Sequence, residues 1–220
     1  MSNLIRADLH MHTYFSKDSG ASPKSIVDRC VKMGINCIAI TDHDNIEGAI
    51  EVKDMAPFDV IIGEEVSSLS GDIIGLFLND LIPGNLTPLE TAQAIKSQGG
   101  LVMVPHPFDR IRPSAITMEA FNEILPYIDI IETFNARNIF GKDDDKAIEM
   151  AKQHHIIFAV SSDAHTAAEL GRTYNSMERF DGTPAGFKVS LANAELITKR
   201  ANFFLRFAPS YARLRGKLRL

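Results

Sequence analysis

The segment Asp8-Leu9-His10-Met11-His12-Thr13 places ionisable side chains at every second position of a strand expected to begin at Ile5. Alternate residues of a strand point to the same face, so Asp8, His10 and His12 are expected to share one face. Imidazole and carboxylate groups together are typical ligands of zinc, manganese and iron. We predict that His10 and His12 bind metal. A structural role is expected for Asp8, which lies deeper in the strand.

The composition is that of an ordinary globular enzyme or binding protein. The chain has 220 residues, 45% hydrophobic and 23% charged, with a net charge of -5. This acidic balance argues against a protein whose main task is to bind nucleic acid. Cys30 and Cys37 form no CxxC pair, and we expect buried free thiols. No apolar run of about 18 residues and no signal sequence is found, so a cytoplasmic protein without a membrane span is expected.

Short apolar strands alternate with amphipathic helices along the chain. Strands are expected at 5–10, 37–40, 60–62, 72–78, 101–104, 128–132 and 156–160, and helices at 22–34, 45–55, 87–97, 118–125 and 145–154. This alternation predicts a parallel α/β sheet, and about seven units fit a closed TIM-like barrel. An open, doubly wound sheet is the alternative. Both architectures collect functional residues at the carboxyl ends of the strands.

Five of the seven histidines follow apolar strands: His10, His12, His43, His106 and His165. Glu65 and Asp163 also follow apolar strands. One four-coordinate ion cannot use so many ligands, so two or three metals are predicted, with Glu65 able to bridge two of them. Asp18 fits either a ligand or an Asx turn. Asp42 is expected to orient a histidine, and Glu64 to face away from the site.

Five segments in this order resemble the PHP (polymerase and histidinol phosphatase) domain family. They are Asp8-Leu9-His10-Met11-His12-Thr13, Thr41-Asp42-His43-Asp44, Gly63-Glu64-Glu65-Val66-Ser67, Pro105-His106-Pro107 and Ser162-Asp163-Ala164-His165. The resemblance implies a distorted (β/α)7 barrel that holds two or three divalent ions of zinc, manganese or iron. It assigns metal ligation to His10, His12, His43, Glu65, His106, Asp163 and His165. Asp18 matches a ligand position in the loop. Asp72 stands where many members carry histidine or glutamate, so it either binds metal or leaves one ion weakly held.

The resemblance also implies a metal-dependent phosphoesterase that hydrolyses a phosphate monoester of a small metabolite or nucleotide. A metal-bound hydroxide attacks phosphorus, and His43, Glu65 and His165 are the expected catalytic residues. Arginine matches phosphate geometry. The candidate substrate-binding residues are Arg110, Arg112, Asn135, Arg137 and Arg172.

The chain is expected to divide into a metal-binding barrel at 1–198 and a basic tail at 199–220 that packs on the barrel or on a partner. Basic and aromatic residues interleave in the tail, which leaves open a contact with nucleic acid or with an anionic membrane surface. A nuclease or oligonucleotide phosphodiesterase and a non-catalytic metal-binding domain stay open as alternatives. An amidohydrolase would be expected to show a lysine carbamate or a different ligand order.

Overall fold

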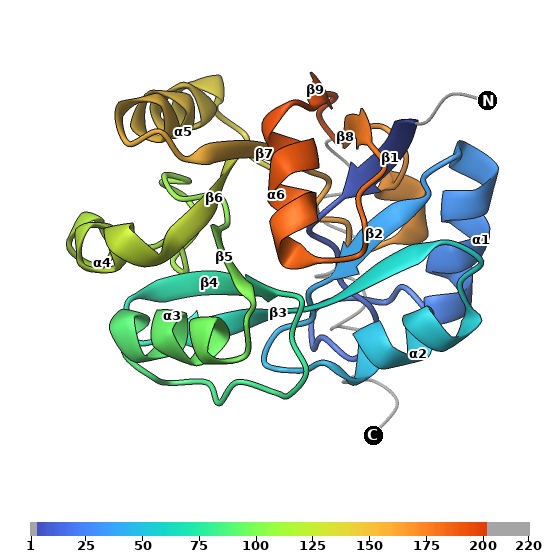
Figure 1. Cartoon of the computed structure of the whole chain (residues 1–220), viewed down its shortest axis with the longest axis horizontal. Helices are drawn as coiled ribbons and strands as arrows, with labels where there is room; N and C mark the ends of the chain where they lie inside the picture. Colours follow the sequence, from blue (N-terminus) through green and yellow to red (C-terminus); the bar gives the residue numbers. More distant parts are fainter. Residues whose placement is uncertain (1–3, 202–220) are drawn as a thin grey trace.

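The structure is a computed structural model that describes residues 4–201 (Figure 1). The strands are β1 (Leu4–Asp8), β2 (Cys37–Ile40), β3 (Asp59–Ser68), β4 (Gly71–Leu76), β5 (Leu101–Val104), β6 (Ile128–Asn135), β7 (Ile157–Ser161), β8 (Tyr174–Glu178) and β9 (Glu195–Ile197). The helices are α1 (Pro23–Met33), α2 (Glu47–Met55), α3 (Pro88–Ser97), α4 (Met118–Ile124), α5 (Gly141–Gln153) and α6 (Pro184–Ala192). Short 3-10 turns occupy Leu125–Tyr127 and Ala167–Glu169. Within 4–201, every helix is too short or too polar to cross a membrane.

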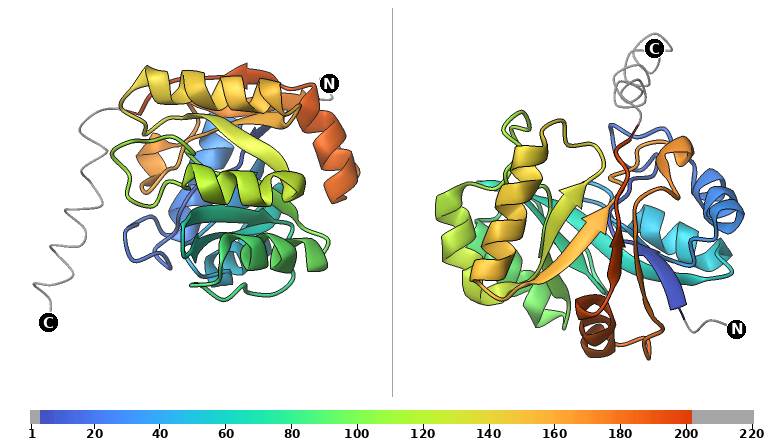
Figure 2. Two further views of the ribbon diagram at one scale, coloured as in Figure 1. Left: turned by 90° about the vertical axis from the view of Figure 1, so that its left-hand side faces the viewer. Right: turned by 90° about the horizontal axis from the view of Figure 1, so that it is seen from above.

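All nine of these strands form one sheet in the order β7-β6-β5-β4-β3-β2-β1-β8-β9. The sheet curls until its ends nearly meet, with helices around the outside (Figures 1 and 2). The predicted distorted TIM-like barrel is therefore confirmed, and the open doubly wound alternative is excluded. An apolar cluster that includes Ile5, Met103 and Ile130 joins residues of β1, β5 and β6. Two further clusters pack α1 to α5 against the sheet.

The side chain of Asn175, in β8, connects β1 to β7, the strand at one end of the sheet order. Its Nδ2 donates to the carbonyl oxygens of Ala7 (3.0 Å) and Val160 (2.9 Å), and its Oδ1 accepts from the amide of Val160 (3.0 Å). Asn175 is fully buried. One amide side chain of β8 thus links β1 to β7 through three hydrogen bonds.

The prediction of an entirely parallel sheet is wrong. The β1–β2, β2–β3, β5–β6 and β6–β7 pairs are parallel, whereas β4 runs antiparallel to β3 and to β5. A tight turn joins β3 to β4 without a helix, and a hairpin makes neighbouring strands antiparallel. Gly71 adopts a φ of 125° at this turn, where a Cβ would lie 2.3 Å from the Cα of Ile116. The β8 strand is antiparallel to β1 and β9.

The capping residues in the sequence predict both ends of α1 correctly, whereas the predicted start of α5 is wrong. The α1 helix begins after the cap residue Ser22, whose side chain accepts from Ser25 N, and ends at Gly34 with a φ of 71°, as predicted. The α5 helix begins at Gly141, four residues before the expected start at 145. Its first turn contains polar residues that interrupt the apolar periodicity.

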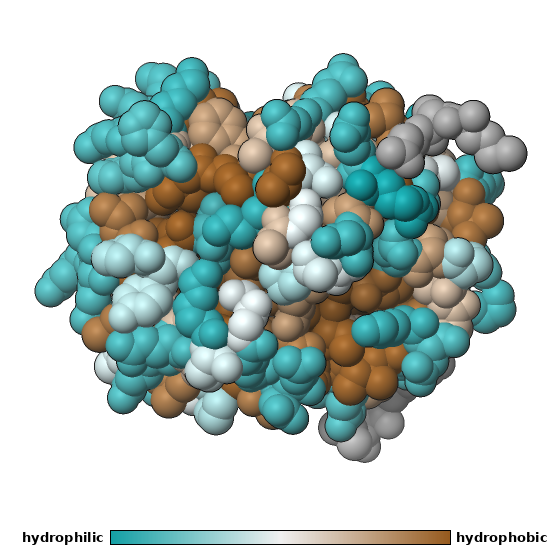
Figure 3. Space-filling model, viewed as in Figure 1, coloured by the Kyte–Doolittle hydropathy of each residue, from teal (hydrophilic) through white to brown (hydrophobic). Residues whose placement is uncertain are grey.

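The surface in the view of Figure 1 is mostly polar, with hydrophobic side chains exposed beside α2 (Figure 3). A hollow of about 730 Å³ lies there, lined in part by Phe58, Val60, Phe77 and Phe180. The β8 and β9 strands and the α6 helix were not expected from the sequence. Their segments are short, and their apolar pattern is weak.

Candidate metal centre

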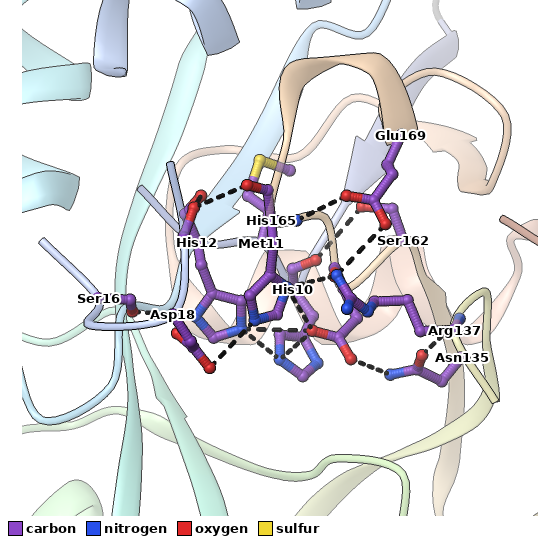
Figure 4. Close-up of polar contacts among 12 residues, drawn as sticks. His10, Met11, His12, Ser16, Asp18, Asn135, Arg137, Ser162, His165 and Glu169 are labelled. Atoms are coloured by element: carbon purple, nitrogen blue, oxygen red, sulfur yellow. Dashed lines mark hydrogen bonds and ion pairs between the residues drawn. The ribbon is translucent and has the colours of Figure 1, made fainter. Parts of the chain in front are cut away.

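The ends of five strands bring seven predicted ligands together. His10 and His12 follow β1, His43 follows β2, Glu65 lies in β3, His106 follows β5, and Asp163 and His165 follow β7. Figure 4 shows His10, His12 and His165 turned toward one another, with Asp18 beside them. Six of the seven are buried, whereas the side chain of His43 is 18% exposed.

Glu65 lies between the histidines of different strands. Its Oε2 is 3.1 Å from His10 Nε2 and 3.3 Å from His12 Nε2, and its Oε1 is 3.1 Å from His106 Nε2. The Nε2 atoms of His10 and His12 are 3.1 Å apart. One carboxylate therefore faces nitrogen atoms on both of its sides, which is the arrangement expected of a ligand that bridges two ions.

Four groups of side chains within residues 4–201 offer ligand atoms that lie within 4.8 Å of one another. The groups are His12, Asp18, His43 and His165; His10, His12 and Asp163; His10, Glu65 and His106; and His43, Glu65 and Asp72. All nine residues predicted as metal ligands belong to at least one of these groups. The shared members His10, His12, His43 and Glu65 connect the groups into one cluster.

The cluster has the chemistry of a cation site. The buried oxygens Asp18 Oδ1, Asp72 Oδ2 and Asp163 Oδ1 have no hydrogen-bond partner. Burial disfavours a charged His10, but the carboxylates of Glu65 and Asp163 outweigh it and hold the pKa of His10 well above its usual value. These carboxylates therefore require a positive charge at this point, and imidazole and carboxylate donors suit zinc, manganese or iron. The residues present fit a group of divalent metal ions.

The edge of the cluster has a different electrostatic character. Burial opposes the charged form of His43, but the Glu65 carboxylate and Asp18 prevail and raise the pKa of His43 to about 9. Burial and the nearby charge of Glu65 raise the pKa of Asp72 to about 6. Burial, with the charge of His165, lowers the pKa of His12 to about 3. The carboxylates around His43 thus favour a positive charge at this position, whereas His12 stays neutral and offers a lone pair.

Two positioning residues were missed by the sequence analysis. Glu132, at 1% exposure, accepts from His10 Nδ1 (3.0 Å) and from the amide of His106 (2.7 Å). Ser16 Oγ lies 3.2 Å from His12 Nδ1 and accepts from the amide of His43 (2.8 Å). Glu132 ends the apolar run of β6, so the rule that found the other ligands would also have found it. Ser16 lies in a loop and carries no comparable signal.

Three acidic residues next to ligands hold the backbone. Asp8 Oδ1 accepts from the amide of Ser162 at 3.0 Å. Glu64 Oε2 accepts from the amide of Ile82 at 2.9 Å, on the side away from the cluster. The hydrogen bonds of Asp42 come from Thr13, at 2.6 Å from N and 2.7 Å from Oγ1. The carboxylate of Asp42 therefore fixes the loop after His12, and within residues 4–201 it makes no direct hydrogen bond to a histidine.

The five predicted substrate-binding residues occupy different positions. Arg112 Nη2 lies 2.8 Å from Asp163 Oδ2. Asn135 is buried, and its Nδ2 donates to Asp163 Oδ2 at 3.2 Å. Arg137 Nη1 lies 3.3 Å from Glu169 Oε1 (Figure 4), and Arg110 binds Asp143. Arg172 is exposed. Arg112 and Asn135 therefore touch the cluster, whereas Arg110, Arg137 and Arg172 do not touch its ligands in the described part of the chain.

The first residues of the predicted basic tail run along the rim of the site. The amide of Ala201 donates to Ala136 O at 2.8 Å. Arg200 pairs with Asp144, and its Cζ lies 4.2 Å from the ring centroid of Phe134. The rest of the predicted tail, 202–220, lies outside the described residues.

Comparisons with known proteins agree with this geometry. Residues 8–72 match the PHP domain profile, and residues 141–193 match the profile described as PHP-associated. An uncharacterized protein of Methanocaldococcus jannaschii is 39% identical over 147 residues, which is 60% of this chain and 82% of that protein.

Solved structures share the fold at low identity. A two-domain protein of Bacteroides vulgatus containing a predicted PHP-like metal-dependent phosphoesterase aligns with a TM-score of 0.73 and 18% identity, over 96% of this chain and 70% of that one. A lesion-specific endonuclease of Pyrococcus furiosus aligns with a TM-score of 0.62 and 18% identity, over 88% of this chain and 57% of that one.

Proposed function

This chain belongs to the PHP domain family, and from that premise we propose that it is a metal-dependent phosphoesterase that hydrolyses a phosphate monoester of a small metabolite or nucleotide. The observation that supports the proposal most strongly is Glu65, whose two oxygens face His10 and His106 at 3.1 Å. Divalent ions, when bound, supply a water of lowered pKa and neutralise the charge on phosphoryl oxygens. Two or three ions of zinc, manganese or iron match the number of donors.

The proposed ligands are the members of the cluster, His10, His12, Asp18, His43, Glu65, Asp72, His106, Asp163 and His165. Glu132 and Ser16 hold the rings of His10 and His12 by their Nδ1 atoms, so both Nε2 atoms point into the cluster. Fixing the ring nitrogen that does not bind metal sets the tautomer and the orientation of a ligating histidine.

Arg112 is the proposed binding group for a phosphoryl oxygen. Its guanidinium lies 2.8 Å from Asp163 Oδ2, at the edge of the cluster. Asp163 and the charge of Glu65 outweigh burial and raise the pKa of Arg112, so the guanidinium keeps its charge. A fixed guanidinium matches two phosphoryl oxygens at once.

Where it is not committed to a metal ion, His43 is the proposed proton donor to the leaving oxygen, and His165 is the alternative. The side chain of His43 is 18% exposed and can face a bound substrate. The Glu65 carboxylate and Asp18 outweigh burial and raise the pKa of His43 to about 9, which favours the protonated ring that a proton donor needs. His165 Nε2 lies 3.4 Å from the same Asp18 oxygen as His43 Nε2, so the two rings stand on either side of one carboxylate.

The test is phosphate release by the full chain reconstituted with zinc, manganese or iron. We expect inorganic phosphate from several phosphomonoesters, no release in the presence of a chelator, and a loss of at least about 100-fold in kcat/KM for His10→Ala. The matched control is His155→Ala, because His155 is exposed and outside the cluster. Failure to release phosphate with every one of the three metals would refute the proposal.

Hydrolysis of oligonucleotides is the second candidate function. The chain approaches 202–220 along the rim of the site, and that segment has five cationic residues and no acidic residue. A cationic segment in a phosphoesterase suits a polyanionic substrate. Dinucleotides in the same assay decide between the two candidates: cleavage of the diester at a rate above that of the monoesters favours the phosphodiesterase.

A further inference from the structure

Three exposed apolar side chains lie on the loops that follow β5 and β6, the loops that also carry residues of the candidate metal centre. Ile111 is 55% exposed, Ile139 49% and Phe140 43%. They lie on two loops, 105–117 and 136–140, and Arg110 joins the loops by placing its Cζ 5.3 Å from the ring centroid of Phe140. We call Arg110, Ile111, Ile139 and Phe140 the Phe140 platform. Single exposed apolar residues are common, but such a group next to a polar site indicates a binding surface.

Both loops of the platform also contact the cluster. Arg112, two residues after Arg110, reaches Asp163 with its Nη2 at 2.8 Å. Asn135, which begins the turn to the second loop, donates to the other side of the same carboxylate oxygen at 3.2 Å. The amide of Asn138 donates to Asn135 O at 3.1 Å. On each loop, the platform residues therefore lie only a few positions from a residue that contacts Asp163, a proposed metal ligand.

Arg110 is fixed where it lies. Its Nε and Nη2 donate to Asp143 Oδ1 at 2.9 Å and 2.6 Å, and Asp143 is buried in the first turn of α5. The Arg110 side chain is still 58% exposed. An exposed guanidinium plane and an exposed aromatic ring, both held in place, are the surfaces on which nucleobases stack.

We propose that the Phe140 platform binds the nucleobase of the substrate while its phosphate lies at the metal centre. The position of the phosphate rests on the proposed function. The platform has a flat aromatic surface for a base and arginines for a neighbouring phosphate, so it selects a nucleotide over a phosphate ester that lacks a ring. A protein partner or residues 202–220 are the other occupants that the test separates.

Fluorescence of 2-aminopurine tests base stacking without relying on hydrolysis. The chain contains no tryptophan, so the emission of the probe is measured without interference. The full-length, manganese-loaded protein is mixed with 2-aminopurine riboside or its 5′-phosphate in a stopped-flow instrument, and quenching is recorded before turnover. We expect saturable quenching, a Kd about tenfold higher for Phe140→Ala, and recovery by Phe140→Tyr. The control Val189→Ala removes an exposed apolar side chain on α6 and leaves the Kd unchanged.

Selectivity in hydrolysis gives the second readout. The ratio of kcat/KM for adenosine 5′-monophosphate to kcat/KM for ribose 5-phosphate is expected to fall about tenfold in Phe140→Ala. Phosphate release with equal kcat/KM for the two esters and no quenching overturns the platform and leaves the proposed function standing. Quenching that depends on Phe140 without any phosphate release supports the platform and refutes the proposed function. Quenching that is the same in wild type and Phe140→Ala overturns the platform and assigns its apolar surface to another occupant.

Discussion

Replacing Glu132 by glutamine removes one charge at nearly constant shape and tests how the cluster is oriented. The carboxylate accepts three hydrogen bonds, from His10 Nδ1 at 3.0 Å, from the amide of His106 at 2.7 Å and from Asn135 Nδ2 at 2.9 Å. Burial raises the pKa of Glu132, but the charge of His10 and their hydrogen bond outweigh it and lower the pKa below its usual value. Glu132 is therefore an acceptor on both oxygens.

A glutamine cannot accept all three of these hydrogen bonds. If its oxygen faces His106 and Asn135, its NH2 group faces His10 Nδ1 and favours the tautomer that protonates Nε2. A proton on Nε2 blocks the nitrogen that points into the cluster. If its oxygen faces His10, its NH2 group meets two other donors, and a buried donor without a partner costs about 1–3 kcal/mol.

We predict that Glu132→Gln lowers metal affinity by about 10–100-fold, which corresponds to about 1.4–2.8 kcal/mol. The affinity is measured by titration of zinc or manganese against a competing chelator, and the thermal unfolding midpoint of the metal-free protein shows whether the variant is folded. Glu123→Gln is the matched control, because Glu123 is exposed on α4. A folded Glu132→Gln protein with wild-type metal affinity would refute the reasoning.

Two further predictions concern the fold. Asn175→Ala leaves three buried backbone groups without their partner and is expected to lower the free energy of unfolding by about 3 kcal/mol in denaturant titrations; a loss no larger than that of the exposed control Asn122→Ala contradicts this. Burial raises the pKa of Cys30 to about 12 and raises that of Cys37 as well, so few thiolates exist at pH 8. Native protein should therefore react with a thiol reagent only as fast as it unfolds, and immediate labelling of either cysteine contradicts this.

The strand ends of the site could be predicted because seven of the nine proposed ligands follow an apolar run in the sequence. The expectation that Asp8, His10 and His12 share one face of a single strand was less accurate. The β1 strand ends at Asp8, before His10 and His12. The two histidines still meet because Met11 pairs with Ala164 and the amide of His12 donates to Ala164 O at 2.9 Å. The bridge between Met11 and Ala164, rather than a continuation of β1, thus holds this segment in place.

Contacts between distant loops could not be predicted. Glu132, Ser16 and Asn175 act through hydrogen bonds to His10, His43 and Ala7, which are distant in sequence and which only the folded barrel brings near them. The arginines show the same limit, because their positions depend on which buried carboxylate pairs with each of them. Arg112 reaches Asp163, whereas Arg110 is held by Asp143. The sequence shows that arginines follow the strands, but the pairing decides which of them reaches the metal-ligand cluster.

The most direct test of the account is the metal content of the purified full-length chain after reconstitution and desalting, measured by inductively coupled plasma mass spectrometry. The account predicts two or three divalent ions per chain. It predicts one or none for Glu65→Gln, because Glu65 faces both His10 and His106. Glu123→Gln should retain the wild-type number of ions. A wild-type protein that retains no more metal than Glu65→Gln would contradict the central claim that these strand ends form a multinuclear metal centre.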